Sequence, residues 1–115
     1  MKKEYRLRKN EDFKKVLDKR QSVSRENFIV YHLKNDFQHC RCGISVSSKI
    51  GNSVIRHKVK RQITSMIDEL ISETNPLDIV IIVRKKYLNN SYSENYDVLE
   101  NVIKFILKKE NRNEK

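Results

Sequence analysis

The sequence predicts an α+β domain in which helices pack against a single β-sheet. Two patterns lead to this class. Three segments have the alternating or continuous apolar pattern of strands, and three others have the 3.6-residue apolar period of helices. The order along the chain is helix, strand, strand, helix, strand, helix, which suits a helix-covered sheet better than a regularly alternating, doubly wound fold. The 115 residues contain no repeat or linker, and we expect one domain, 1–115.

The N-terminal part is expected to contain a basic tail and a short helix. Residues 1–9 are rich in lysine and arginine, and we expect them to be loosely ordered. Asn10 is a residue type that suits a helix N-cap, and the two acidic residues after it favour the positive end of the helix dipole. The helix should end near residue 20, and one of its faces carries Phe13, Val16 and Leu17.

Two strands are predicted next. In Phe28–Leu33 successive side chains point to opposite faces, so Tyr31 lies on the face opposite Phe28. In Arg41–Ser47 apolar residues alternate with small or polar ones, which leaves one face with room for a close neighbour. A polar stretch separates the two segments, and we expect the strands to pair as a hairpin.

A long helix is expected to begin at Asn52 or Ser53 and to run to about Glu73. Because one edge of its apolar stripe is basic at the N-terminal end, the first turns should project beyond the core while the last turns are buried. The stripe consists of Ile55, Val59, Ile63, Met66, Ile67, Leu70 and Ile71.

The C-terminal third predicts one more strand and one more helix. Leu77–Val83 contains five consecutive apolar β-formers and should be a fully buried central strand. A polar loop over 85–93 then leads to a helix over 94–108, which has an apolar side. The charged residues 110–115 are expected to form a flexible tail.

The start of the predicted long helix is crowded with positive charge. Like charges at such spacing repel one another, and no Asp or Glu occurs over 37–66 to offset them. The whole chain has a net charge of +10 and a pI of about 9.7, values that together with clustering are typical of nucleic-acid binding. The cluster, which indicates a polyanionic partner, consists of Arg56, His57, Lys58, Lys60 and Arg61.

Several other classes of function are excluded by what the sequence lacks. Two glycines cannot supply a P-loop or a dinucleotide fingerprint, so a small-molecule nucleotide substrate is not expected. Cys40 and Cys42 have no second ligand pair for a metal, and the scattered carboxylates predict no catalytic residue on the protein. The chain has neither a membrane-length apolar run nor a signal-peptide pattern, which indicates a cytoplasmic protein with reduced thiols and no membrane partner.

The aromatic residues suggest how a single strand could be held. Tyr31 lies on the strand face opposite Phe28, and Phe13 lies on the first helix. Aromatic rings beside a basic helix end are a common way to bind single-stranded nucleic acid, because bases stack on the rings while cations follow the phosphates.

The segment from Lys49 to Arg61, KIGNSVIRHKVKR, resembles the signature K-x-G-N-A-V-x-R-N-R-x-K-R of the protein subunit of bacterial ribonuclease P. The stretches YRLRKNEDFKKVL, SVSRENFIVYHL and DIVIIVRK extend the resemblance over nearly the whole chain. It implies one α/β sandwich with a four-stranded sheet, in the order αβββαβα, and a left-handed β-α-β crossover against the usual rule. It also implies a fourth strand, for which Ser22–Ser24 is the candidate.

The resemblance also implies a function in tRNA processing. The RNA subunit of this ribonucleoprotein endonuclease carries the catalysis with Mg²⁺, and the protein binds that RNA and the 5′ leader of precursor tRNA. By matching position, the leader cleft would be formed by Phe13, Leu17 and Tyr31. The contacts to the catalytic RNA would come from Lys49, Asn52, Arg56, His57, Lys58, Lys60 and Arg61.

Two alternatives to this function remain. A structural, ribosomal-protein-like RNA-binding protein with no role in cleavage fits the charge and the fold class. A DNA-binding regulator is disfavoured, because no helix-turn-helix spacing is apparent.

Overall fold

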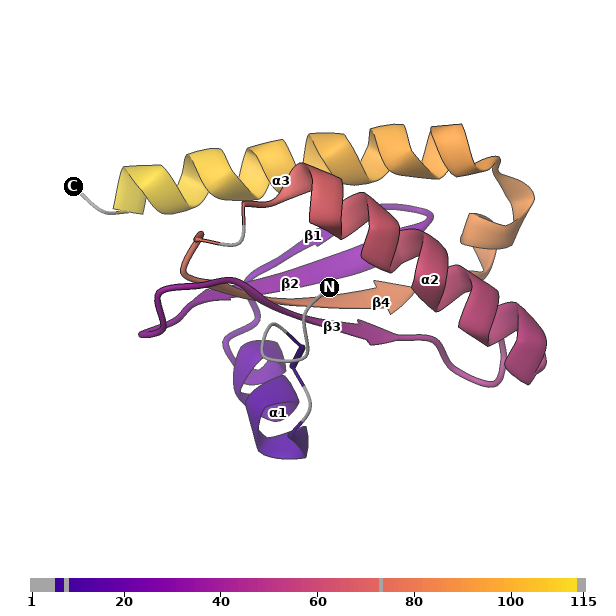
Figure 1. Cartoon of the computed structure of the whole chain (residues 1–115), viewed down its shortest axis with the longest axis horizontal. Helices are drawn as coiled ribbons and strands as arrows, with labels where there is room; N and C mark the ends of the chain where they lie inside the picture. Colours follow the sequence, from indigo (N-terminus) through magenta and orange to yellow (C-terminus); the bar gives the residue numbers. More distant parts are fainter. Residues whose placement is uncertain (1–5, 8, 73, 114–115) are drawn as a thin grey trace.

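The computed structural model describes residues 6–7, 9–72 and 74–113 of the chain. Helices α2 and α3 cover one face of a four-stranded sheet, and α1 covers the other face (Figure 1). The elements are α1 (Asn10–Asp18), β1 (Ser22–Ser24), β2 (Phe28–Lys34), β3 (Arg41–Ser45), α2 (Ser53–Leu70), β4 (Leu77–Val83), the 3₁₀ helix η2 (Lys85–Asn89) and α3 (Tyr92–Asn113).

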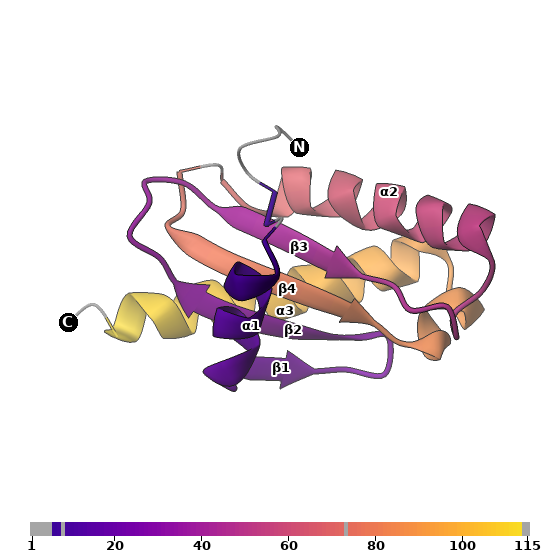
Figure 2. The ribbon, with the colours of Figure 1, turned by 90° about the horizontal axis from the view of Figure 1, so that it is seen from below.

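The sheet has the strand order β1-β2-β4-β3, with β4 in its interior. β2 pairs with β4 antiparallel, and β3 pairs with β4 in parallel, so the expected hairpin between β2 and β3 is wrong. The physical reason is that β4 is the most apolar strand and gains most from being flanked on both sides. In Figure 2, β3, the returning helix α2 and β4 form a left-handed crossover, as the family resemblance implies.

Two layers of apolar side chains hold the sheet between the helices. The larger layer packs alternate residues of β4, such as Ile79 and Ile81, against α2 and α3. The smaller layer packs Val80 against Val16 of α1 and against Leu7. β4 is central, as predicted, and all of its residues are buried except Ile82, which is half-buried. The candidate strand β1 is confirmed.

The helix starts differ in how they are capped. Asn52 is confirmed as the N-cap of α2, since its Oδ1 accepts a hydrogen bond of 3.0 Å from the N–H of Ile55. α1 instead begins at Asn10 itself, and the residue before it, Lys9, makes no side-chain cap. In α3 the side chains of Ser91 and Glu94 accept hydrogen bonds from each other's N–H groups, so the helix starts earlier than predicted.

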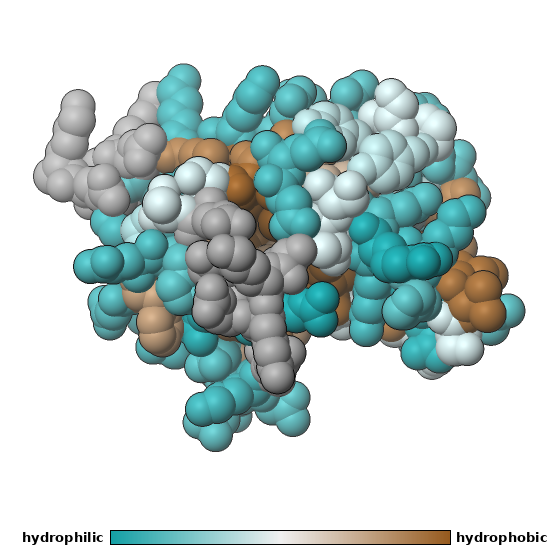
Figure 3. Space-filling model, viewed as in Figure 1, coloured by the Kyte–Doolittle hydropathy of each residue, from teal (hydrophilic) through white to brown (hydrophobic). Residues whose placement is uncertain are grey.

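The first turn of α2 projects from the body of the protein, as the sequence predicts. Val54 is 75% exposed and Ile55 is 37% exposed, so Ile55 does not belong to the core stripe in which it was placed. Figure 3 shows a hydrophobic patch at this end of the molecule, where α2 begins. The helix ends at Leu70, short of Glu73, which lies outside the described residues.

Three stretches expected to be irregular are partly ordered. Leu7 is buried, and its N–H donates to the carbonyl of Cys42, so it belongs to the fold rather than to a tail. The predicted loop 85–93 contains η2, whose Tyr87 is buried and donates to Gln62 of α2. α3 runs to Asn113, which corrects the expectation of a tail from residue 110. The tail positions 1–5, 8 and 114–115 are outside the described residues.

The C-terminal turns of α3 are held by a buried polar pair. Nδ1 of His32, on β2, lies 2.7 Å from Oε1 of Glu110, and His32 is fully buried. The other ring nitrogen of His32 is also buried and has no hydrogen-bond partner within the described residues. The hydrogen bond to Glu110 is therefore the polar contact of this imidazole.

In the described part of the chain, no helix is both long and apolar enough to cross a bilayer.

We expect Glu110→Ala to lower the free energy of unfolding by about 1–3 kcal/mol, because it leaves the His32 ring buried without its acceptor. Urea unfolding measures the change. Glu100→Ala is the matched control in the same helix: its carboxylate lies 3.9 Å from Lys104 on the surface, and the expected loss is below about 0.5 kcal/mol. Equal losses in the two variants would contradict the role given to Glu110.

Candidate nucleic-acid interface

The first three turns of α2 carry an exposed row of positive charge, which we call the basic end of α2. His57, Lys58, Lys60 and Arg61 are exposed, and Arg56 is half-buried. The Nε atom of Arg56 is buried and has no hydrogen-bond partner among the described residues. Lys49 and Asn52 are also exposed, and they lie just before the helix. All seven residues assigned to RNA contact are thus gathered around one end of α2.

A groove of about 750 Å³ runs between α1, β3 and α2, and we call it the α1–α2 groove. Its α2 wall includes His57, Lys60 and Arg61, so these three side chains face a concave surface. Phe13 of α1 and Gly43 of β3 also line it. The remaining lining residues are Arg6, Leu7, Cys42, Ile44, Thr64, Ser65 and Asp68.

Some of these lining residues were missed from the sequence. Thr64 and Ser65 follow Lys60 and Arg61 by four positions, and Asp68 follows Thr64 by four, so they share one helix face. Extending the basic cluster along this face would have found them. Arg6 gave no such signal, because its place depends on the parallel bridge that it forms with Cys42.

Gly43 allows α1 to approach the sheet closely. A Cβ atom built on this glycine would overlap Cζ of Phe13, far inside van der Waals contact. The room predicted on this face of β3 is therefore filled by the Phe13 ring. The helix that carries this ring, α1, lies in front of the sheet in Figure 2.

The three residues assigned to the leader cleft come together on the α1 side of the sheet. Phe13, Leu17 and Tyr31 are each half-buried and pack in one apolar cluster around Val16 and Val80. Tyr31 points away from the main core, as the alternation of β2 predicts, because Phe28 is fully buried on the other side. Of the three, Phe13 also lines the α1–α2 groove, whereas Leu17 and Tyr31 do not.

The groove and its surroundings contain thiols, cations and a carboxylate. Burial raises the pKa of the Cys40 thiol to about 12, with a smaller contribution from Asp78, and burial also raises the pKa of Cys42. Both thiols are therefore protonated at neutral pH, and neither is a nucleophile. The lining residues include three cations and a single carboxylate, that of Asp68. These side chains suit the binding of phosphate oxygens better than the binding of a Mg²⁺ ion.

Comparison with known proteins identifies the family of the chain. The sequence profile of the family described as Ribonuclease P matches residues 1–107. The ribonuclease P protein component of Listeria monocytogenes is 42% identical over the full length of both chains. The chain belongs to the ribonuclease P protein family.

Solved structures of this family have the same fold. The ribonuclease P protein of Staphylococcus aureus superimposes with a TM-score of 0.81 at 37% identity, over 89% of this chain and 94% of that one. That of Thermotoga maritima gives 0.75 at 30% identity, over 86% and 94%. The role of the chain is therefore that of the protein component of ribonuclease P.

We expect Gly43→Ala to displace the Phe13 ring and to lower the free energy of unfolding by about 1–3 kcal/mol, the usual range for overpacking. The double variant Gly43→Ala, Phe13→Leu should lose less than the sum of the single changes, as measured by urea unfolding. Gly51→Ala is a control, because the nearest atoms to its Cβ would be those of the exposed Ile55 side chain, at 3.0 Å. Additive losses at Gly43 and Phe13 would contradict the close packing described.

Proposed function

We propose that this chain binds the RNA subunit of ribonuclease P and the 5′ leader of precursor tRNA, and thereby assists endonucleolytic removal of the leader. In this proposal the RNA subunit and its Mg²⁺ ions break the phosphodiester bond, and the protein is not catalytic. The complex acts in the cytoplasm. The observation that carries the proposal is that cations of α2 and the aromatic Phe13 line the same groove.

The basic end of α2 is suited to neutralising phosphates where two RNA molecules approach each other. Four lysine and arginine side chains lie within six residues of the helix, and the helix has no acidic residue in its first turn. Lys58 acts as a point charge, whereas Arg56 and Arg61 can bind phosphate oxygens with two parallel hydrogen bonds. Neutralised phosphates would also raise the affinity of the neighbouring RNA for its magnesium ions.

The α1 side of the sheet is suited to a single strand of RNA. Half-buried aromatic side chains offer ring surface to bases at little entropic cost, since Phe13 and Tyr31 are already held by their neighbours. Stacking of this kind accepts every base, so selectivity for leader sequence should be modest. A structural RNA-binding role without cleavage is the alternative, and reconstitution separates the two.

In a reconstitution with a bacterial ribonuclease P RNA at low Mg²⁺, we expect the protein to restore leader cleavage, and the protein alone to show none. Changing Arg56, Lys60 and Arg61 together to Gln should lower the slope of log affinity against log salt by roughly 2–3, because about three phosphate contacts are lost.

The control for this variant changes Lys104, Lys108 and Lys109 of α3 to Gln, which removes the same charge from exposed positions away from the groove. If both triple variants lose affinity equally, net charge rather than the basic end of α2 governs binding. Binding of the RNA without any rescue of cleavage would favour the structural alternative.

We expect Tyr31→Ala to weaken binding of precursor tRNA to the holoenzyme by roughly 5-fold or more, and to leave binding of mature tRNA unchanged, because only the precursor has a leader to stack. Filter binding or fluorescence titration measures both affinities. Tyr92→Ala is the matched control, since Tyr92 is 41% exposed on α3. An equal loss for precursor and mature tRNA would place Tyr31 in a purely structural role.

A further inference from the structure

We propose that the ring of Phe37 is a stacking platform for one unpaired base of a single-stranded RNA. Phe37 lies in the turn between β2 and β3 and is 50% exposed, although it is large and apolar. The proposal extends the leader path beyond the α1–α2 groove, and in this respect it rests on the proposed function.

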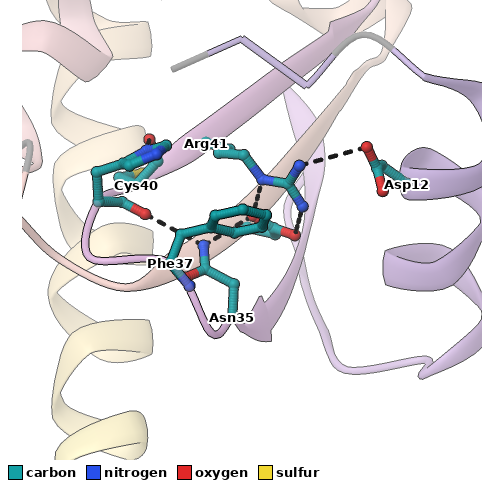
Figure 4. A network of polar contacts seen from close by, with 7 residues as sticks. Asp12, Asn35, Phe37, Cys40 and Arg41 are labelled. Atoms are coloured by element: carbon teal, nitrogen blue, oxygen red, sulfur yellow. Dashed lines mark hydrogen bonds and ion pairs between the residues drawn. The ribbon is translucent and has the colours of Figure 1, made fainter. Parts of the chain in front are cut away.

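The Phe37 ring is fixed in place before any ligand arrives. Its backbone N–H donates to Oδ1 of Asn35 at 3.0 Å, and the amide of Asn35 donates to Asp78 at 2.8 Å. The guanidinium of Arg41 lies 4.3 Å from the centre of the ring, a cation–π contact (Figure 4). An exposed aromatic ring that is already held loses little conformational entropy when a base stacks on it.

Arg41 beneath the ring is itself held firmly. It donates from Nε and Nη2 to the two carboxylate oxygens of Asp78, at 2.8 and 2.6 Å, and Asp78 is only 3% exposed. These hydrogen bonds raise the pKa of Arg41, which therefore stays charged. Nη1 reaches Asp12 of α1 at 3.3 Å, so the support of the ring is tied to both β4 and α1.

The position of Phe37 continues the line of the groove. Arg41 and Gly43 lie two residues apart on β3 and on the same face, because one contacts Asp12 and the other contacts Phe13, both of α1. Two strand residues advance by about 6.6 Å. Phe13 over Gly43 and Phe37 over Arg41 therefore place two aromatic rings in succession along one strand of the sheet.

The charge around Phe37 favours a base over a phosphate. Asp78 and Asp12 are both paired with Arg41, and Asp36 is an exposed neighbour of the ring in the chain. Acidic groups at this spot would repel a phosphate, whereas a stacked base presents an uncharged face. The platform should thus contribute to affinity without contributing to its salt dependence.

The test titrates the full chain with single-stranded RNA that carries 2-aminopurine, moved one position at a time along the strand. In the unchanged protein we expect fluorescence quenching at one position that Phe37→Ala abolishes and Phe37→Tyr retains. Phe105→Ala is the matched control, because Phe105 is 55% exposed on α3. Quenching that survives in Phe37→Ala at every position would overturn the proposal.

A second arm uses the holoenzyme with precursor tRNAs of increasing leader length. We expect Phe37→Ala to weaken binding of long-leader precursors by at least about 5-fold, with an unchanged salt slope, and to leave mature tRNA unaffected. Equal losses for precursor and mature tRNA, or a lower salt slope, would overturn the platform. If the unchanged holoenzyme does not prefer precursor over mature tRNA, the proposed function fails. The fluorescence titration with single-stranded RNA still tests the stacking role of Phe37 in that case.

Discussion

Burial of β4 on both of its faces is the constraint from which the rest of the arrangement follows. Ile79 and Ile81 face α2 and α3, while Val80 and Ile82 face α1. A strand that is apolar on both faces is stable only when both are covered. The helix pair α2 and α3 covers one face, and the short helix α1 is required on the other. The α1–α2 groove exists because these two coverings meet at the outer edge of β3, next to the bridge between Arg6 and Cys42.

The single acidic residue of β4 couples this core to the groove. Asp78 is nearly fully buried, and a buried carboxylate without a partner costs several kcal/mol. Arg41 of β3 supplies the partner through two hydrogen bonds and also contacts Asp12. Asp12 directly precedes Phe13 in α1. The contact of Arg41 with Asp12 therefore also helps to position Phe13 in the wall of the groove. The same guanidinium supports Phe37, so one buried charge organises several surface features.

The sequence predicted the elements whose pattern of buried and exposed residues can be seen within a few consecutive positions. The bounds of β4 match because five consecutive apolar β-formers carry the signal, and the faces of β2 follow from simple alternation. The predicted pairing of β2 with β3 was wrong. The partner of β3 is β4, which follows only after the whole of α2, so no local pattern reveals it. The end of α3 was missed because the partner of Glu110, His32, lies 78 positions away. In the site, the basic cluster and the room at Gly43 were visible, but that Phe13 fills this room was not.

The two walls of the groove offer different kinds of interaction to a ligand. Exposed cations on α2 attract phosphates through forces that salt screens, whereas half-buried aromatic rings act through contact that salt leaves nearly unchanged. The charge also changes along the α2 wall: Lys60 and Arg61 lie seven to eight residues before Asp68, or about 10–12 Å along the helix. An RNA strand in the groove would therefore make its strongest phosphate contacts at the start of α2. Toward Asp68 the α2 wall loses its positive charge, so contacts made there would depend less on salt.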